Sequence, residues 1–112
     1  MTSSDKQSAQ AQPKAMTSPP MTTDITTTLQ ERGSRYGKFL DHAKVTMDLK
    51  TAIKHHLELR EKVLNADQEE ALDMICHKIG RIINGDPDYA DSWHDIAGYA
   101  QLVADRLNGV ER

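Results

Sequence analysis

The fold is decided by residues 67–84, D-Q-E-E-A-L-D-M-I-C-H-K-I-G-R-I-I-N, in the second half of this 112-residue chain. Apolar residues recur there at the period of a helix that buries one face. They are Ala71, Leu72, Ile75, Ile79, Ile82 and Ile83. Asp67 and Glu70 have the spacing of a capping box, and Gly85 is placed to end the helix in a left-handed turn. Gly80, inside the pattern, indicates either a close approach by another helix or a tolerated defect.

A second helix is predicted after the turn signal Asp86-Pro87-Asp88, because proline suits the first helical position. The pair Asn108-Gly109 ends it. Its apolar face comprises Tyr89, Trp93, Ile96, Ala97, Ala100, Val103, Ala104 and Leu107. Since the intervening loop is short, we expect the two helices to pack as an antiparallel hairpin.

Upstream, residues 39–60 are predicted to form a third long helix, and residues 25–30 a short one that leads into breaks at Gly33 and Gly37. No segment alternates apolar and polar residues as a half-buried strand would. The sequence therefore predicts an all-α fold, a small helical bundle of three main helices plus a short first helix. A domain this small buries a low fraction of its surface, so we expect oligomerisation to complete the bundle.

Residues 1–24 are predicted to be a disordered tail, which leaves residues 25–112 as a single α-helical domain. The segment is rich in Ser, Thr, Gln, Ala and Pro and contains no Leu, Ile, Val or aromatic residue. Such a composition cannot bury enough apolar surface to offset the loss of chain entropy on folding.

Composition excludes several classes of function. No apolar run approaches the ~18 residues of a membrane helix, and no secretory signal is recognisable. The formal net charge of −3 argues against direct binding of nucleic acid, whose partners are basic. A single cysteine, Cys76, excludes an intramolecular disulfide framework and a zinc site built from cysteines.

Polar residues form a row on the helix predicted at 67–84. At 100° per residue, five of them fall within a stripe of ~80° opposite the isoleucine face. They are Glu70, Asp73, His77, Arg81 and Asn84. The row is either a binding site for a metal ion or phosphate, or a solvated face stabilised by pairs four residues apart.

Asp91 and Asp95 lie four residues apart within an acidic stretch, residues 86–95, that contains no Lys or Arg. Carboxylates at this spacing repel each other unless a cation lies between them. Mg²⁺ or Mn²⁺, which prefer oxygen ligands, would remove that repulsion. The alternative is a pair of surface acids near a helix N-terminus, where the helix dipole favours them.

Residues 31–39, E-R-G-S-R-Y-G-K-F, are the basic counterpart. Arg32, Arg35 and Lys38 are candidates for phosphate contacts, and Tyr36 for stacking on a base. The alternative is a helix–helix joint with solvated basic side chains. His42, three residues after Phe39, is a candidate for a hydrogen-bonded core histidine.

Two strings in the chain carry a family resemblance. They are R-G-S-R-Y-G-K-F-x-D-H at residues 32–42 and E-A-L-D-M-I-x-H-K-I-G-R-I-I-N-G-D-P-D-Y-A-D-S-W-H-D-I-A-G-Y-A at residues 70–100. The chain resembles a family of small proteins encoded by phages and prophages. More distantly, it resembles the all-α, MazG-like nucleoside triphosphate pyrophosphohydrolases.

That resemblance implies a cytoplasmic dimer or higher oligomer in a bacterial host, with Mg²⁺ held by acids on facing helices. Members of the MazG-like group cleave nucleotides between the α and β phosphates. Glu70 and Asp73 fit the first acidic motif and Asp95 fits the aspartate of the second, which makes these three the catalytic candidates. Ser92 stands where the second motif has glutamate, so the adjacent Asp91 would complete the metal site. Counterparts in related phage families imply phosphate contacts for Lys78, Arg81 and Tyr99.

Three hypotheses of function follow. The first is a nucleotide-binding protein that, if catalytic, hydrolyses a nucleoside triphosphate to monophosphate and pyrophosphate with Mg²⁺. The second is a non-catalytic binder that sequesters a nucleotide used in host defence, in which the basic segment matters more than the acids. The third is a helical module that binds another protein.

Overall fold

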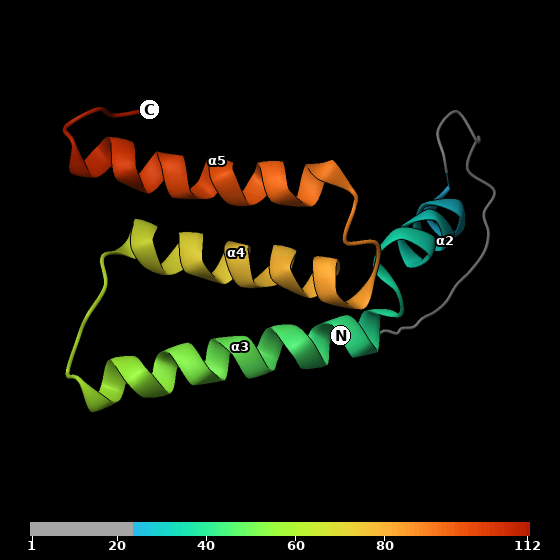
Figure 1. Cartoon of the computed structure of the whole chain (residues 1–112), viewed down its shortest axis with the longest axis horizontal. Helices are drawn as coiled ribbons and strands as arrows, with labels where there is room; N and C mark the ends of the chain where they lie inside the picture. Colours follow the sequence, from blue (N-terminus) through green and yellow to red (C-terminus); the bar gives the residue numbers. More distant parts are fainter. Residues whose placement is uncertain (1–23) are drawn as a thin grey trace.

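The computed structural model describes residues 24–112, which form four helices and contain no strand. The short α2 spans Ile25–Tyr36, and the long helices are α3 (Phe39–Leu59), α4 (Ala66–Asn84) and α5 (Ala90–Leu107) (Figure 1). The all-α prediction, with one short and three long helices, is confirmed. The predicted tail lies outside the described residues apart from Asp24, whose carboxylate accepts a hydrogen bond from the Thr27 N–H at the start of α2 (2.9 Å).

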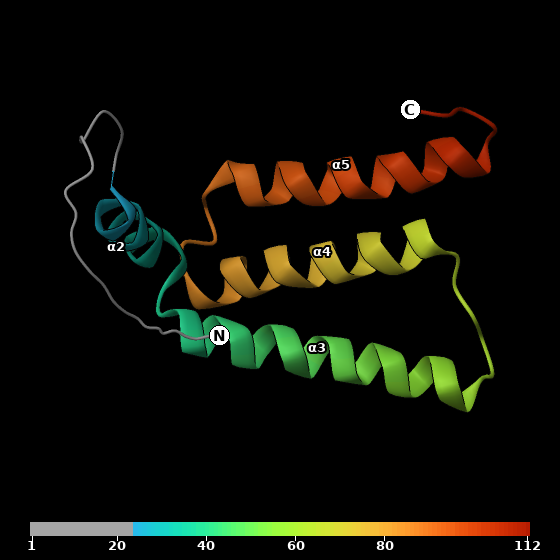
Figure 2. The same cartoon turned by 180° about the vertical axis from the view of Figure 1, so that it is seen from behind.

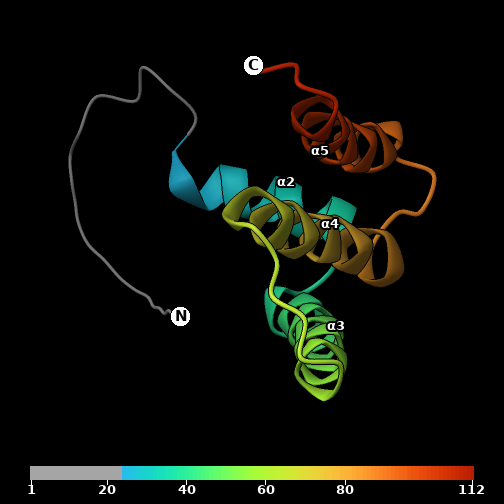
Figure 3. The same ribbon diagram turned by 90° about the vertical axis from the view of Figure 1, so that its left-hand side faces the viewer.

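The three long helices form a layer with α4 in the middle (Figures 1 and 2). Within the described chain, α4 packs against both α3 and α5, whereas α3 and α5 do not touch. Seen end-on, α2 crosses the end of this layer, and its first turns project beyond one face (Figure 3). The single chain is therefore an open layer, in which Ala71 and Cys76 are the only buried apolar side chains among the described residues.

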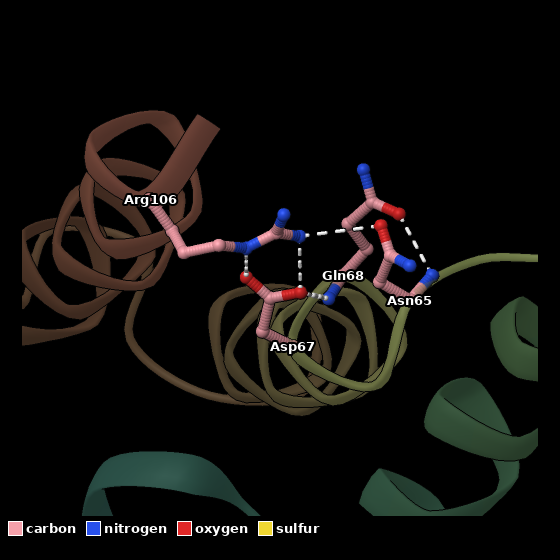
Figure 4. Close-up of polar contacts among 4 residues, drawn as sticks. All are labelled: Asn65, Asp67, Gln68 and Arg106. Carbon is pink, nitrogen blue, oxygen red and sulfur yellow. Dashed lines mark hydrogen bonds and ion pairs between the residues drawn. The ribbon is translucent and has the colours of Figure 1, made fainter. Parts of the chain in front are cut away.

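α4 and α5 are antiparallel, as predicted from their short connection. Two ion pairs fix their register: Lys78 Nζ lies 3.1 Å from Asp95 Oδ2, and Arg106 Nη2 lies 2.6 Å from Asp67 Oδ1 (Figure 4). The predicted capping box is wrong by two residues, since Asn65 is the N-cap and its N–H donates to the side chain of Gln68 (2.8 Å). Asp67 lies inside the first turn, where its carboxylate accepts the Gln68 N–H (3.0 Å) and binds Arg106.

α4 ends at Asn84 as predicted, but the expected left-handed turn at Gly85 is wrong, since φ there is −130°. Glycine is needed for another reason. A Cβ at this position would overlap the backbone of Arg35 and Tyr36, against which the α4–α5 connection is packed. The Asp86 N–H donates to the Arg35 carbonyl oxygen (2.7 Å) beside it.

Two other predicted boundaries are corrected. α2 continues through Gly33, because nothing opposes a helix there and one glycine costs only ~1 kcal/mol. Gly37, with φ of 80°, is the break. α5 starts at Ala90 rather than at Pro87, which lies in the preceding turn and accepts a hydrogen bond from Trp93 Nε1 (2.8 Å). Within residues 24–112, no helix is both long enough and apolar enough to cross a membrane.

Candidate functional site

A cleft of about 600 Å³ lies where α2, α3 and α4 meet. Each of the three helices and the short α2–α3 linker contributes to its wall. The lining residues are Leu29, Arg32, Gly33, Tyr36, Gly37, Lys38, Phe39, His42, His77 and Arg81. The basic segment predicted at residues 31–39 therefore forms one wall, and the C-terminal half of the polar row on α4 forms the other.

Asn84 attaches the linker to the end of α4. Its Nδ2 donates to the carbonyl oxygens of Tyr36 (2.8 Å) and Lys38 (3.0 Å). Gly37 lies between these two residues, and a Cβ there would overlap the carbonyl oxygen of Asn84. This amide, the last member of the predicted polar row, therefore positions the cleft wall instead of facing solvent.

Gly80 brings α3 and α4 together at the base of the cleft. A Cβ at Gly80 would lie 2.5 Å from Thr46 Oγ1 and 2.9 Å from His42 Nδ1. Both Thr46 and His42 are buried. The predicted close helix approach at Gly80 is thus confirmed, and so is the buried position of His42.

The two cleft histidines contact each other through ring nitrogens. His42 Nε2 lies 3.2 Å from His77 Nδ1, and the rings meet edge to face. Burial lowers the pKa of His77 to about 4, and His42 and Arg81 act in the same direction. Burial also lowers the pKa of His42. Both rings are therefore neutral at pH 7, as their contact requires, because one nitrogen must donate and the other accept.

The fixed charge of the cleft is positive. Arg32, Lys38 and Arg81 line it, and no Asp or Glu is among its lining residues. Arg81 is held in place by Tyr36, because its guanidinium carbon lies 4.1 Å from the centre of the tyrosine ring. An anion that entered the cleft would meet three cations and the N–H groups that two of them carry on planar guanidinium forks.

The exposed aromatic surface of the cleft belongs to Phe39. Tyr36, the residue predicted to stack on a base, is covered by Arg81 and meets Tyr89 edge-on at a centroid distance of 6.2 Å. Phe39 is 69% exposed, and its ring lies 6.0 Å from that of His42. Tyr36 also lines the cleft, so its stacking role stays a prediction, but its interactions with Arg81 and Tyr89 leave Phe39 as the more exposed ring.

Three predicted phosphate ligands lie away from the cleft. Arg35 is stacked on Tyr89, with 4.5 Å between its guanidinium carbon and the ring centre. Lys78 faces α5, where it is paired with Asp95. Tyr99 lines a shallow depression on α5 beside Leu102. Arg32, Tyr36, Lys38 and Arg81 are the predicted nucleotide-binding residues that the structure brings together.

The four predicted metal ligands are dispersed. Asp73 borders a hollow shared with Lys50 of α3. Asp91 accepts a hydrogen bond from the Tyr89 hydroxyl (2.9 Å), and Asp95 is paired with Lys78. Glu70 is exposed.

The register of the hairpin explains this dispersal. The two ion pairs place Asp73 level with Ala100, which lies about 13 Å along the helix axis from Asp91. Among residues 24–112, no three His, Cys, Asp or Glu side chains are grouped so as to hold a metal ion. Mg²⁺ therefore does not fit the carboxylates of this chain as they are arranged, and we derive no chemical step from it.

Two features of the cleft were not predicted from the sequence: the exposed ring of Phe39 and the contact between His42 and His77. A signal for the second was present. His42 and Thr46 are four residues apart, and Gly80 and His77 are three apart, so each pair shares one helix face.

No protein-family model, curated protein or solved structure matches the chain.

Proposed function

We propose that this chain binds a phosphate-bearing nucleotide in the α2–α3–α4 cleft without a metal ion and without turning it over. The observation that carries the proposal is the grouping of three cations, with no carboxylate, beside an exposed aromatic ring. The cleft volume of about 600 Å³ falls in the range of small-molecule sites, roughly 300–1,000 Å³.

The phosphate groups would lie against Arg81, Arg32 and Lys38. Arg81 is already fixed by its contact with Tyr36, so less side-chain entropy is lost when it binds. Arg32 and Lys38 are exposed and make no side-chain hydrogen bond or ion pair within residues 24–112. Their charges are therefore available to a ligand.

The base would lie against Phe39 and Leu29, which are 69% and 59% exposed. Stacking on an aromatic side chain contributes about 1–3 kcal/mol per base and tolerates any base, because every base has a π face. The proposal therefore specifies a nucleotide and not one particular base. His77 supplies a neutral ring nitrogen at the base of the cleft.

Hydrolysis with Mg²⁺, implied by the family resemblance, is the weaker alternative. It requires Glu70, Asp73, Asp91 and Asp95 to share an ion, and two of these carboxylates already have partners on their own chain. Sequestration needs only the cations and the ring.

The test is a thermal-shift and calorimetric screen of nucleoside mono-, di- and triphosphates and cyclic nucleotides, in chelator and in Mg²⁺. A ligand that binds only the folded chain raises its melting temperature. We expect at least one nucleotide to do so in chelator, and to be recovered intact after denaturation. Release of pyrophosphate in Mg²⁺ would instead support the hydrolase, and no shift with any nucleotide would refute both.

Two substitutions locate the site. Arg32→Gln should weaken binding by roughly 10- to 100-fold, the loss of one charge-assisted hydrogen bond. Arg60→Gln is the matched control, since Arg60 follows the far end of α3 and contacts His56. Phe39→Ala should weaken binding of the nucleotide but not of inorganic phosphate. Equal loss for both ligands would mean that no base lies on this ring.

A further inference from the structure

One face of the helix layer carries apolar side chains without charge. On α4, the side toward α5 is marked by Lys78, and the side toward α3 by Gly80. At 100° per residue, one flank between them is apolar. Its members are Leu72, Ile75, Ile79 and Ile83. The opposite flank carries Glu70, His77 and Arg81.

α5 has a matching flank. Within the described chain α5 contacts only α4, so its side toward α4 is marked by the buried Ser92 and by the half-buried Tyr99 and Val103. About 100° further round the helix runs a stripe at alternating spacings of four and three residues. It comprises Trp93, Ala97, Ala100, Ala104 and Leu107. Trp93 and Leu107 are 55% and 59% exposed, and the three alanines are exposed as well.

The two flanks lie on the same face of the layer. In each helix, the apolar flank lies about 100° from the side that meets the other helix, measured around the helix axis in the direction of the chain. Two antiparallel right-handed helices then present these flanks together. We call this surface the isoleucine–alanine face, and it is the face opposite the cationic cleft, which uses His77 and Arg81 from the other flank of α4.

We infer that the isoleucine–alanine face is the interface of a homodimer, covered by the same face of a second copy of this chain. A two-fold interface brings a surface against itself, so a charged residue near the axis would approach its own copy. This face contains none. The charged residues of α5 are engaged elsewhere: Asp95 by Lys78, Arg106 by Asp67, and Asp105 by Arg112.

The order of sizes along α5 supports a second copy in particular. A large residue stands at each end of the stripe, and three alanines lie between them. With a two-fold axis near Ala100, Trp93 of one copy faces Leu107 of the other, and the alanines let the helices approach closely. A lipid surface is the less suitable occupant, because the isoleucine–alanine face carries no Lys or Arg that could meet lipid headgroups.

The available area is of the size that a dimer needs. Helices of 18 and 19 residues are about 27 Å long and pack roughly 10 Å apart, so the layer presents a face on the order of 500–700 Å² before side-chain relief is counted. Stable dimers bury about 800 Å² per partner. The same burial would cover four large apolar side chains that the single chain leaves exposed, namely Leu72, Ile83, Trp93 and Leu107.

The experiment is light scattering on the full chain after size-exclusion chromatography, over a wide range of concentrations. The expected mass is twice the chain mass of 12.6 kDa. Ala100→Arg places like charges at the two-fold axis and should give the single-chain mass. Leu102→Arg is the matched control, because Leu102 is 50% exposed on the other flank of α5 and should leave the dimer intact.

A second measurement covers the case in which Ala100→Arg fails to fold. The melting temperature of the unmodified chain should rise with protein concentration, because dimerisation stabilises the folded state by mass action. A single-chain mass at all concentrations, with a constant melting temperature, would overturn the inference. So would a dimer that survives Ala100→Arg but dissociates with Leu102→Arg.

Discussion

The two contacts of α4 are built differently. Toward α3 and α2, it uses close approach and neutral polar groups: Gly80 against His42 and Thr46, the two histidines, and the Asn84 amide on the linker. Toward α5, it uses the ion pairs of Lys78 with Asp95 and of Asp67 with Arg106. The candidate site lies on the first side, where glycine lets side chains from three helices converge. The α4–α5 contact fixes the register of the two helices. It also pairs Lys78 with Asp95, which were candidates for phosphate and metal binding.

The largest effect should come from filling the space at Gly80. Gly80→Ala places a methyl group against the buried Thr46 hydroxyl and His42 ring, which have no room to move. We expect a loss of about 3 kcal/mol in the free energy of unfolding, the upper range for overpacking. Urea denaturation measures it. Gly98→Ala on α5 is the control, because nothing lies within 4 Å of a Cβ there, and it should stabilise by about 0.5–1 kcal/mol. Equal effects would mean that the α3–α4 contact is not tight.

The second-largest effect should come from lowering the pH, which decreases the free energy of unfolding through His77 in the α3–α4 contact. The pKa of His77 falls from 6.5 to about 4 on folding, so the unfolded chain binds the proton more readily. His77 therefore favours folding fully above pH 6.5, and this contribution is lost as the pH falls toward 4. We expect about 2 kcal/mol after allowing for partial exposure, against an upper limit of about 3.

Denaturation curves between pH 4 and 7 test this linkage, since His77→Gln should flatten the pH dependence. The control is His55→Gln, because His55 is exposed on α3 and lines no part of the cleft. Arg81, Lys78 and Lys50 carry the fixed positive charges that oppose protonation of His77, and His42 opposes it when its own ring is protonated. If the pH dependence of stability were unchanged in His77→Gln, groups other than His77 would be responsible for it.

Removing the contact between Asn84 and the α2–α3 linker should lower the free energy of unfolding by a smaller amount. Asn84→Ala removes both hydrogen bonds to the carbonyl oxygens of Tyr36 and Lys38, and we expect a loss of about 1–2 kcal/mol. Amide exchange in α2 should accelerate more than in α5, and nucleotide binding should weaken with it. Asn108→Ala, at the end of α5, is the control. Uniform acceleration in all helices would contradict a local role for Asn84.

The ionic side should give the smallest effect. The Arg106–Asp67 pair is about 40% exposed on each partner, so solvent screens it. Arg106→Gln should lower the urea midpoint slightly, and the difference should vanish in high salt. A double-mutant cycle with Asp67→Asn isolates the pair. An effect as large as that of Gly80→Ala would reverse the comparison between the two contacts.

Much of the secondary structure could be predicted from the sequence. The apolar period of residues 67–84, the stop at Asn84 and the short connection before α5 all depend on neighbours along the chain. The errors were also local: α2 continues through Gly33 because nothing opposes it, Pro87 lies in the turn before α5, and Asn65 with Gln68 forms the cap of α4. Part of the candidate site was predictable too, because Arg32, Lys38 and Arg81, all candidate phosphate contacts, line the same cleft.

The sequence by itself determined the helices, the hairpin of α4 with α5 and the inventory of charged residues, because helical period and turn chemistry are properties of short segments. Only the tertiary structure decided which charges are available. Asp95, a candidate metal ligand, and Lys78, a candidate phosphate contact from the family resemblance, bind each other because the antiparallel register places them at one level. Arg32, Phe39 and His77 share a cleft because Gly80 and Asn84 hold three helices together there, and no one-dimensional pattern contains that distance.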